Sequence, residues 1–90
     1  MAWNIRISQT AEKQISKLDK MSQKRVVSFL RQRLIDHEDP KRLAKRLKGS
    51  DQPLWRFRVG DYRLICDIQE DVLTVVVLSV GHRKNVYRLK

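Results

Sequence analysis

The chain has 90 residues, with 20 Lys and Arg against 10 Asp and Glu, and a formal net charge of +10. This length predicts one small domain over residues 1–90 with a single core. The charge indicates a polyanionic partner, either a nucleic acid or an acidic protein. A membrane partner is disfavoured because no stretch combines a long apolar face with a basic one. The single cysteine, Cys66, excludes an internal disulfide and favours a reducing cytoplasm.

The first elements in chain order are a strand and a helix. Residues 3–7 alternate between apolar and polar side chains, which is the pattern of a short strand. Residues 11–18 then repeat apolar side chains at helical spacing, and either Ser8 or Thr10 can cap the helix that contains them.

A second helix follows, with Ser22 as its predicted N-cap. Its core face consists of five apolar residues: Val26, Val27, Leu30, Leu34 and Ile35. The arginines of this helix lie off that face, and we assign them to solvent: Arg25, Arg31 and Arg33.

A short helical element is predicted between Asp39 and Gly49, because Asp39 can cap it, Pro40 suits its first position and Gly49 suits its end. Five cations crowd this stretch: Lys41, Arg42, Lys45, Arg46 and Lys48. They are either a solvated charge run or a surface that contacts a nucleic-acid backbone, and the sequence leaves both interpretations open.

The stretch Leu54–Arg63 predicts a β-hairpin with a two-residue loop at Gly60 and Asp61. In this register Arg58 faces Arg63 and Phe57 faces Leu64. One side of the hairpin then carries Arg56, Arg58 and Arg63, and the other carries apolar residues and the buried Cys66. Like charges directly opposite each other destabilise a hairpin, so this pairing favours a bound phosphate over a merely solvated basic face.

The chain continues with a strand over residues 63–68, a turn at residues 69–71, and a nearly all-apolar central strand, Val72–Val80, that ends at Gly81. The order β-α-α-β-β-β predicts an α+β domain, with two helices packed on one face of a mainly antiparallel four-stranded sheet. The register decides whether His82 or Arg83 points at the arginines.

The residue types exclude several kinds of site. Three glycines do not form a Gly-rich phosphate loop, two His and one Cys are not spaced as metal ligands, and no acidic pair is placed for two-metal chemistry. We therefore predict no metal and no cofactor.

The remaining cations, with His82 and Tyr87, suit metal-free RNA cleavage, in which the 2′-hydroxyl attacks the adjacent phosphorus and guanidinium groups stabilise the growing charge. Tyr87 either stacks on an unpaired base or anchors the tail to the sheet.

Four segments carry a resemblance to a known family. They are Arg46-Leu47-Lys48-Gly49, Trp55-Arg56-Phe57-Arg58, Gly60-Asp61-Tyr62-Arg63-Leu64, and Leu78-Ser79-Val80-Gly81-His82-Arg83 followed by Val86-Tyr87. In this combination and order the chain resembles the RelE/ParE toxin superfamily, and within it the RelE ribosome-dependent mRNA interferases. The likeness extends over nearly the whole chain.

The resemblance implies cleavage of mRNA in the ribosomal A site, without metal, by a toxin that a cognate antitoxin inhibits. Arg63 and Arg83 match the family's phosphate-stabilising arginines, and Tyr87 matches its stacking tyrosine. Arg56 and Arg58 occupy the positions of two family lysines that serve in proton transfer. This is a departure, because arginine stays charged and is a poor base, whereas the pKa of lysine can be lowered.

The departure leaves the general base open among three options. His82 is the leading candidate, because an ordinary histidine titrates near neutral pH. Asp61 is weaker, because turn aspartates usually bond their own backbone. The third option is that positioning and charge neutralisation suffice without a base.

The resemblance also implies partners and competing functions. The expected partners are a RelB-like antitoxin, the ribosome and mRNA, with operator DNA contacted only through the antitoxin. Ribosomal RNA would contact the cations of residues 41–48 together with Lys84. The alternatives are a non-enzymatic gyrase inhibitor of the ParE kind and a plain nucleic-acid binding module.

Overall fold

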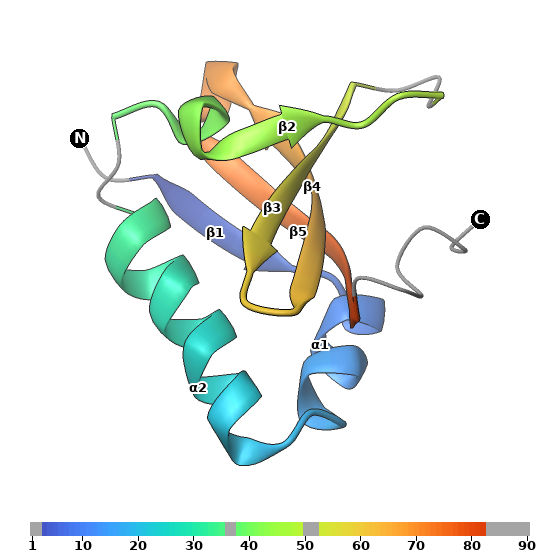
Figure 1. Ribbon diagram of the computed structural model, residues 1–90. Helices are drawn as coiled ribbons and strands as arrows, with labels where there is room; N and C mark the ends of the chain where they lie inside the picture. The colour runs from blue at the N-terminus through green and yellow to red at the C-terminus, as the bar shows by residue number, and fades with distance from the viewer. Residues whose placement is uncertain (1–2, 36–37, 50–52, 83–90) are drawn as a thin grey trace.

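The computed structural model describes residues 3–35, 38–49 and 53–82. Within these ranges a five-stranded sheet in the order β1-β5-β4-β3-β2 packs against two helices (Figure 1). The elements in chain order are β1 (Asn4–Ile7), α1 (Gln9–Ser16), α2 (Lys20–Ser28), the π-helical segment η1 (Phe29–Leu34), the 3-10 turn η2 (Pro40–Leu43), β2 (Ala44–Arg46), β3 (Leu54–Val59), β4 (Tyr62–Gln69), the 3-10 turn η3 (Glu70–Val72) and β5 (Thr74–His82).

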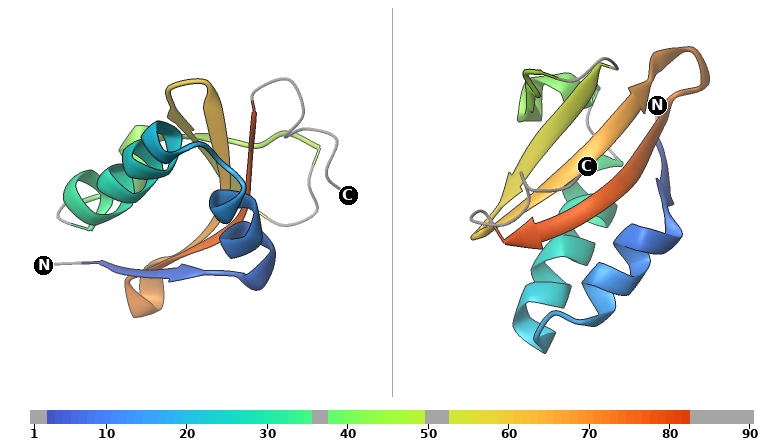
Figure 2. Two further views of the ribbon diagram at one scale, coloured as in Figure 1. Left: turned by 90° about the horizontal axis from the view of Figure 1, so that it is seen from below. Right: turned by 90° about the vertical axis from the view of Figure 1, so that its right-hand side faces the viewer.

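The sheet is mostly antiparallel, as the sequence predicts. The pairs β2–β3, β3–β4 and β4–β5 are antiparallel, and β1 alone pairs in parallel, with β5. The strands β3, β4 and β5 are consecutive in the chain and pair as an antiparallel meander, whereas the parallel partners β1 and β5 are the first and last elements of the described chain. The α+β fold with helices on one face is therefore confirmed, and the helices precede the meander in the chain (Figure 2).

Two side-chain caps fix where the helices begin. The Ser8 hydroxyl accepts a hydrogen bond from the Ala11 amide at 3.0 Å and donates one to the Leu78 carbonyl at 2.9 Å, so it joins the start of α1 to β5. Asp19, rather than the predicted Ser22, caps α2, because its carboxylate accepts from the Ser22 amide. Hydrogen bonding to Ser22 lowers the pKa of Asp19 below its ordinary value.

The core lies between the helices and one face of the sheet. From the helical side it contains Val26, Phe29 and Leu34, and the Phe29 ring lies 5.5 Å from that of Phe57 on β3. Strand residues complete it: Phe57, Leu64, Cys66, Val75 and Val77. Cys66 is buried as predicted, and this burial, with the Asp67 charge adding to it, raises the pKa of its thiol. No helix in the described part of the chain is long and apolar enough to cross a bilayer.

The predicted four-stranded sheet has a fifth strand, because the short helical element predicted between Asp39 and Gly49 ends at Leu43. Only Pro40–Leu43 adopts a 3-10 turn, and Ala44–Arg46 pair with β3 as strand β2. Pro40 sets a helical first turn, but Ala44 then lies directly opposite the buried Phe57. Tertiary pairing thus overrides the local helical signal.

The last strand also begins and ends later than predicted. Glu70–Val72 form a 3-10 turn that closes at Leu73, whose φ of 47° is left-handed, and β5 starts at Thr74. The strand then passes through Gly81 to His82, because these two residues pair with Arg63 and Tyr62 of β4. An irregularity between Ile65 and Cys66 in the β4–β5 pairing sets the register at this end of the sheet.

Candidate functional site

The β3–β4 hairpin has the predicted register. Val59 pairs with Tyr62, Arg58 with Arg63 and Phe57 with Leu64, around a two-residue loop. Gly60 in that loop has a φ of 59°, a conformation that a residue with a side chain rarely adopts. The loop residue therefore fixes the pairing, and the pairing fixes which side chains share a face.

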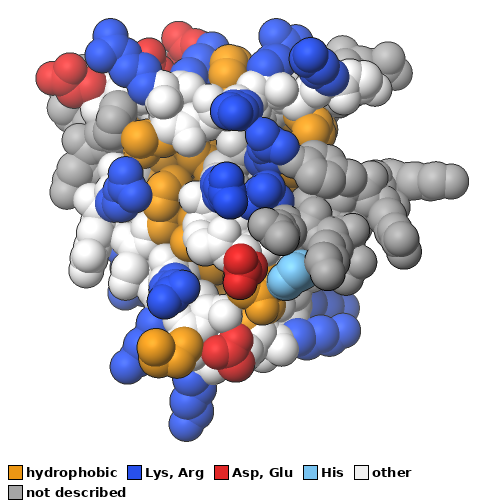
Figure 3. Space-filling model, viewed as in Figure 1, with side chains coloured by type: hydrophobic (Ala, Val, Ile, Leu, Met, Phe, Trp, Pro, Cys, Tyr) orange, Lys and Arg blue, Asp and Glu red, His pale blue; other side chains and the backbone are white. Residues whose placement is uncertain are grey.

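Three arginines and a lysine share the face of the sheet opposite the core. Arg58 lies opposite Arg63, and Arg56 lies between Ile65 of β4 and Lys45 of β2. We call Lys45, Arg56, Arg58 and Arg63 the arginine face. In space-filling view, Lys and Arg side chains crowd the surface around β2 and β3 (Figure 3). The predicted convergence of Arg56, Arg58 and Arg63 is thus present in the register.

Arg63 lies at the centre of the arginine face, with Arg58 on one side and Gly81 on the other. Its Nε and Nη1 atoms are buried and find no hydrogen-bond partner among the residues that the structure describes. The next cross-strand pair on this face, Ile65 and Ser79, is buried. Two unpartnered guanidinium donors beside a second cation suit an anion with several oxygens, such as phosphate.

His82 lies on the other side of the sheet from these arginines. It pairs with Tyr62, and the two rings meet edge to face with their centroids 5.7 Å apart. Asp61, the weaker base candidate, is exposed in the hairpin loop. Neither side chain is brought to the arginine face by the register. Three predicted site residues lie outside the described residues: Arg83, Lys84 and Tyr87.

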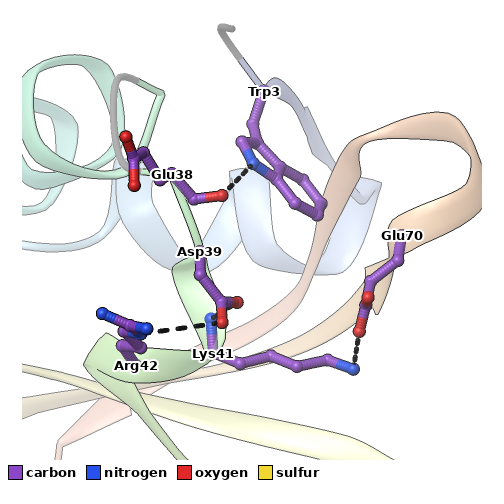
Figure 4. Close-up of polar contacts among 6 residues, drawn as sticks. All are labelled: Trp3, Glu38, Asp39, Lys41, Arg42 and Glu70. Atoms are coloured by element: carbon purple, nitrogen blue, oxygen red, sulfur yellow. Dashed lines mark hydrogen bonds and ion pairs between the residues drawn. The ribbon is translucent and has the colours of Figure 1, made fainter.

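The cations between residues 41 and 48 divide into two groups. Lys41 forms an ion pair with Glu70, and Arg42 lies 3.9 Å from Asp39 (Figure 4). Lys41 and Arg46 both lie over the Trp55 ring, at 5.2 and 5.9 Å from its centroid.

Figure 4 also shows that Trp3 donates a hydrogen bond from its indole nitrogen to the Glu38 carbonyl, beside the same ion pairs. Partners within the chain therefore engage Lys41, Arg42 and Arg46. Lys45 and Lys48 are exposed, and together with Arg46 and Arg56 they line a concavity of about 340 Å³.

Arg25, Arg31 and Arg33 of the helical segment are exposed, as the sequence predicts, but Arg25 and Arg33 also have neighbours within the chain. A Cβ atom added to Gly60 would lie 3.4 Å from Nη1 of Arg25, so this guanidinium lies over the hairpin loop. Arg33 lies 5.8 Å from the centroid of the Phe29 ring. Helical periodicity identifies such residues as outward-facing, but it does not show that a hairpin from distant sequence approaches them.

Metal ligands do not gather in the described ranges, where no group of three or more His, Cys, Asp or Glu side chains is placed to hold an ion. The arginine face itself offers fixed positive charge and hydrogen-bond donors.

Comparison with known proteins decides the family. Residues 5–87 match the family described as ParE toxin of type II toxin-antitoxin system, parDE. The chain belongs to the ParE toxin family. The resemblance to the RelE/ParE superfamily seen in the sequence is thereby confirmed.

Individual relatives of this ParE-family toxin extend the likeness over its whole length. Toxin RelG of Mycobacterium tuberculosis is 33% identical over 88 residues, which are 98% of this chain and 99% of the relative. The solved toxin–antitoxin complex RelBE2 of the same organism contains a chain with a TM-score of 0.82 and 31% identity, over 92% of this chain and 100% of that one. A mutant of E. coli toxin RelE has the same fold, with a TM-score of 0.71 and 20% identity over 97% of this chain and 90% of its own.

Proposed function

We propose that this toxin is a ribosome-dependent endoribonuclease, which cleaves mRNA in the A site by attack of the ribose 2′-hydroxyl on the adjacent phosphorus, without a metal. The observation that carries the proposal is the guanidinium of half-buried Arg63, directly opposite Arg58, whose buried Nε and Nη1 atoms have no hydrogen-bond partner in the described structure. A phosphate oxygen would satisfy the donors and offset the repulsion between the two arginines.

Charge stabilisation is the main chemical contribution of this site. As the 2′-oxygen attacks, negative charge accumulates on the non-bridging oxygens, and a fixed guanidinium binds that state more tightly than the ground state. The loss of one such donor typically costs about 2.7–4 kcal/mol of transition-state stabilisation. In the proposal Arg63 supplies this contact, with Arg56 and Arg58 on the same face of the sheet. The resemblance to the family adds Arg83 as a second phosphate-stabilising arginine and Tyr87 as the residue that stacks on a base and holds the nucleotide in line.

Proton transfer is the step that the residues support least. Arg56 and Arg58 are poor bases, and the register places neither His82 nor Asp61 on the arginine face. The geometry therefore favours the third of the options considered for the base, in which positioning and charge neutralisation carry the reaction. Rates would then depend on how well the ribosome holds the mRNA in line, because alignment alone can replace much of the barrier.

The proposed partners follow from charge and from the relatives. A relative 31% identical was solved as a toxin–antitoxin complex, which supports a RelB-like antitoxin as partner of this chain, with operator DNA contacted only through it. The net charge of +10 suits ribosomal RNA, and the exposed Lys45 and Lys48 are the cations of their segment most open to it. Translation takes place in the cytoplasm, where the protein would act.

The decisive experiment adds the purified chain to an extract that translates a defined mRNA. The extract contains only the divalent metal ions that the ribosome itself requires. Cleavage mapped within codons of ribosome-bound mRNA, and absent from the same mRNA without ribosomes, is the expected result. Intact mRNA in an extract whose translation the added chain has stopped would contradict the proposal.

Gyrase inhibition is the second candidate, because the matching family is described as ParE toxin. A supercoiling assay with purified gyrase separates the two. Inhibition of supercoiling with intact mRNA indicates the ParE kind of action, and cleaved mRNA with active gyrase indicates the RelE kind.

A further inference from the structure

The last strand, β5, changes its neighbour partway along its length. Its first residues pair with β1, but that pairing ends where Ile7 faces Val77. Beyond this point no strand of the described chain pairs with β5 on its β1 side, although the strand continues to His82. Helix α1 lies beside this second half instead (Figure 1). The part of β5 that reaches the arginine face is therefore held on one side by a helix.

Two residues of this helical segment make the contacts that a neighbouring strand would make. Ser8 donates from its amide to the Val77 carbonyl and from its hydroxyl to the Leu78 carbonyl, both at 2.9 Å. The side chain of Gln14 then accepts a hydrogen bond from the Val80 amide, which lies 2.6 Å from its Oε1. These bonds satisfy backbone groups that an open strand edge would otherwise leave without partners.

An extra residue in β5 coincides with the change of neighbour. Val77 and Ser79 pair with successive residues of β4, so Leu78 between them has no partner on that strand. A bulge of this kind disturbs the pairing locally and determines which side chains beyond it face each side of the sheet. The Ser8 hydroxyl binds the carbonyl of the extra residue, so α1 contacts β5 at the point where its register shifts.

Gln14 acts on the stretch between this bulge and the end of the strand. Amides along a strand point alternately to its two edges, so the Val80 amide on the α1 side places that of Gly81 on the β4 side. There Gly81 lies opposite Arg63, whose Nε and Nη1 atoms are buried. Val80 is only 2% exposed, so its amide depends on Gln14 rather than on solvent. A displacement at Val80 would move the backbone beside Arg63 and the chain that leads to Arg83.

We propose that Gln14 is a positioning residue of this toxin, whose hydrogen bond to Val80 holds the end of β5 against β4 and so fixes the arginine face for phosphate. Gln14 belongs to the helical layer, whereas Arg63 lies on the opposite face of the sheet, so Gln14 acts through β5. Its effect on cleavage rests on the proposed function. Misplacement of a reacting group by about 1 Å can cost about 10²-fold in rate, so the loss of one such bond is measurable.

Two substitutions of Gln14 separate hydrogen bonding from packing. Gln14→Met retains the length and helical preference of the side chain but removes the acceptor, whereas Gln14→Glu retains an acceptor oxygen. Ser8 is less suitable for this test, because it also caps α1.

The cleavage assay measures single turnovers on ribosome-bound mRNA over a range of ribosome concentrations. Gln14→Met should lower the maximal rate about tenfold or more and change the half-saturating concentration less than about twofold, because the arginine face acts on the transition state. Gln14→Glu should restore the maximal rate to within about threefold of the wild type. A normal rate for Gln14→Met would overturn the role in catalysis, and a Gln14→Glu variant as slow as Gln14→Met would overturn the role of the acceptor.

Gln23→Met is the matched control. The Gln23 side chain donates to the Ser16 and Leu18 carbonyls at 3.2 and 3.1 Å, at the C-terminal end of α1. The substitution therefore removes hydrogen bonds of a glutamine in the helical layer that are not made to β5. Urea denaturation compares the stabilities of the two Met variants. Gln23→Met should cleave as the wild type does, and an equal loss of rate in both variants would mean that Gln14 serves only the fold.

NMR of the ¹⁵N-labelled protein tests the position of β5 without cleavage. The Val80 amide should exchange with solvent about tenfold faster in Gln14→Met than in the wild type, because it has lost its acceptor. A titration with inorganic phosphate, followed at the Nε–H resonance of Arg63, should show binding weakened several-fold in Gln14→Met and unchanged in Gln23→Met. Unchanged exchange and unchanged phosphate binding in Gln14→Met would overturn the proposal.

The two kinds of measurement separate this inference from the proposed function. If the wild-type toxin leaves mRNA intact, the endoribonuclease proposal fails, but amide exchange and phosphate binding still decide whether Gln14 positions the arginine face. If the wild type cleaves and Gln14→Met differs from it in none of these measurements, the proposed function stands and the role of Gln14 is refuted.

Discussion

Arg58 and Arg63 face each other directly across the β3–β4 hairpin, with no side chain of opposite charge between them in the register. Two like charges in this position oppose the pairing that brings them together. The hairpin forms because Phe57 and Leu64, the next pair along, are fully buried against the helices. Packing of the core thus holds the two guanidinium groups close together, and a bound anion would reduce the repulsion between them.

Arg63→Ala should lower single-turnover mRNA cleavage about 10²–10³-fold, since the lost contact stabilises the transition state. Thermal stability should stay the same or rise, because Nε and Nη1 of Arg63 have no hydrogen-bond partner among the described residues to lose. Arg6→Ala, an exposed change on β1 at the far end of the sheet, is the control and should cleave normally. A cleavage rate that Arg63→Ala leaves intact would remove Arg63 from the reaction.

Arg58→Thr should stabilise the fold by about 0.2–1 kcal/mol, because it removes the like-charge pair and places a β-branched residue in a strand. Urea denaturation at low salt measures the gain. The gain should shrink in high salt, where screening already weakens the repulsion between exposed charges. A loss of stability at low salt would show that Arg58 makes a favourable contact that outweighs its repulsion from Arg63.

His82→Gln should leave the pH profile of cleavage unchanged between about pH 6 and 8, the range in which an ordinary histidine titrates. The reason is the register, which directs His82 to Tyr62 rather than to the arginines. Cleavage rates for wild type and variant across this range provide the measurement. If the variant loses a pH dependence that the wild type has, His82 is the base after all.

The sequence predicts the β3–β4 hairpin well, because a local pattern determines its geometry. Gly60 and Asp61 select a two-residue loop, and the loop fixes every pair from Val59–Tyr62 back to Arg56–Ile65. The faces of the hairpin follow, including the burial of Cys66. The two loop residues are enough to assign each side chain of the hairpin to a face, because side chains in a strand alternate strictly between faces.

The features that the sequence does not predict depend on contacts between distant segments. Ala44–Arg46 form a strand because β3 is available to pair with them, although Pro40 and the surrounding residues favour a helix. The side of His82 depends on the irregularity between Ile65 and Cys66 in the β4–β5 pairing, beyond which His82 lies opposite Tyr62. Arg25 becomes part of a groove only because the hairpin tip approaches α2.

The buried thiol of Cys66 should make stability depend on pH in the alkaline range. Burial raises its pKa in the folded state above the ordinary 9.0, which the unfolded chain retains. The contribution is fully present below about pH 9. Above that the unfolded chain releases a proton that the folded chain keeps, and the free energy of unfolding falls by up to about 1.4 kcal/mol per pH unit.

Cys66→Ala isolates this contribution, because the other alkaline titrations are common to both proteins. At about pH 8 the variant should be less stable than the wild type, since it leaves a small cavity in the core. At about pH 10 the difference should narrow by roughly 1 kcal/mol, because only the wild type loses the thiol contribution. Urea denaturation of both proteins at the two pH values is the measurement. A difference that stays constant would mean that the thiol ionises as easily in the folded state as in the unfolded chain.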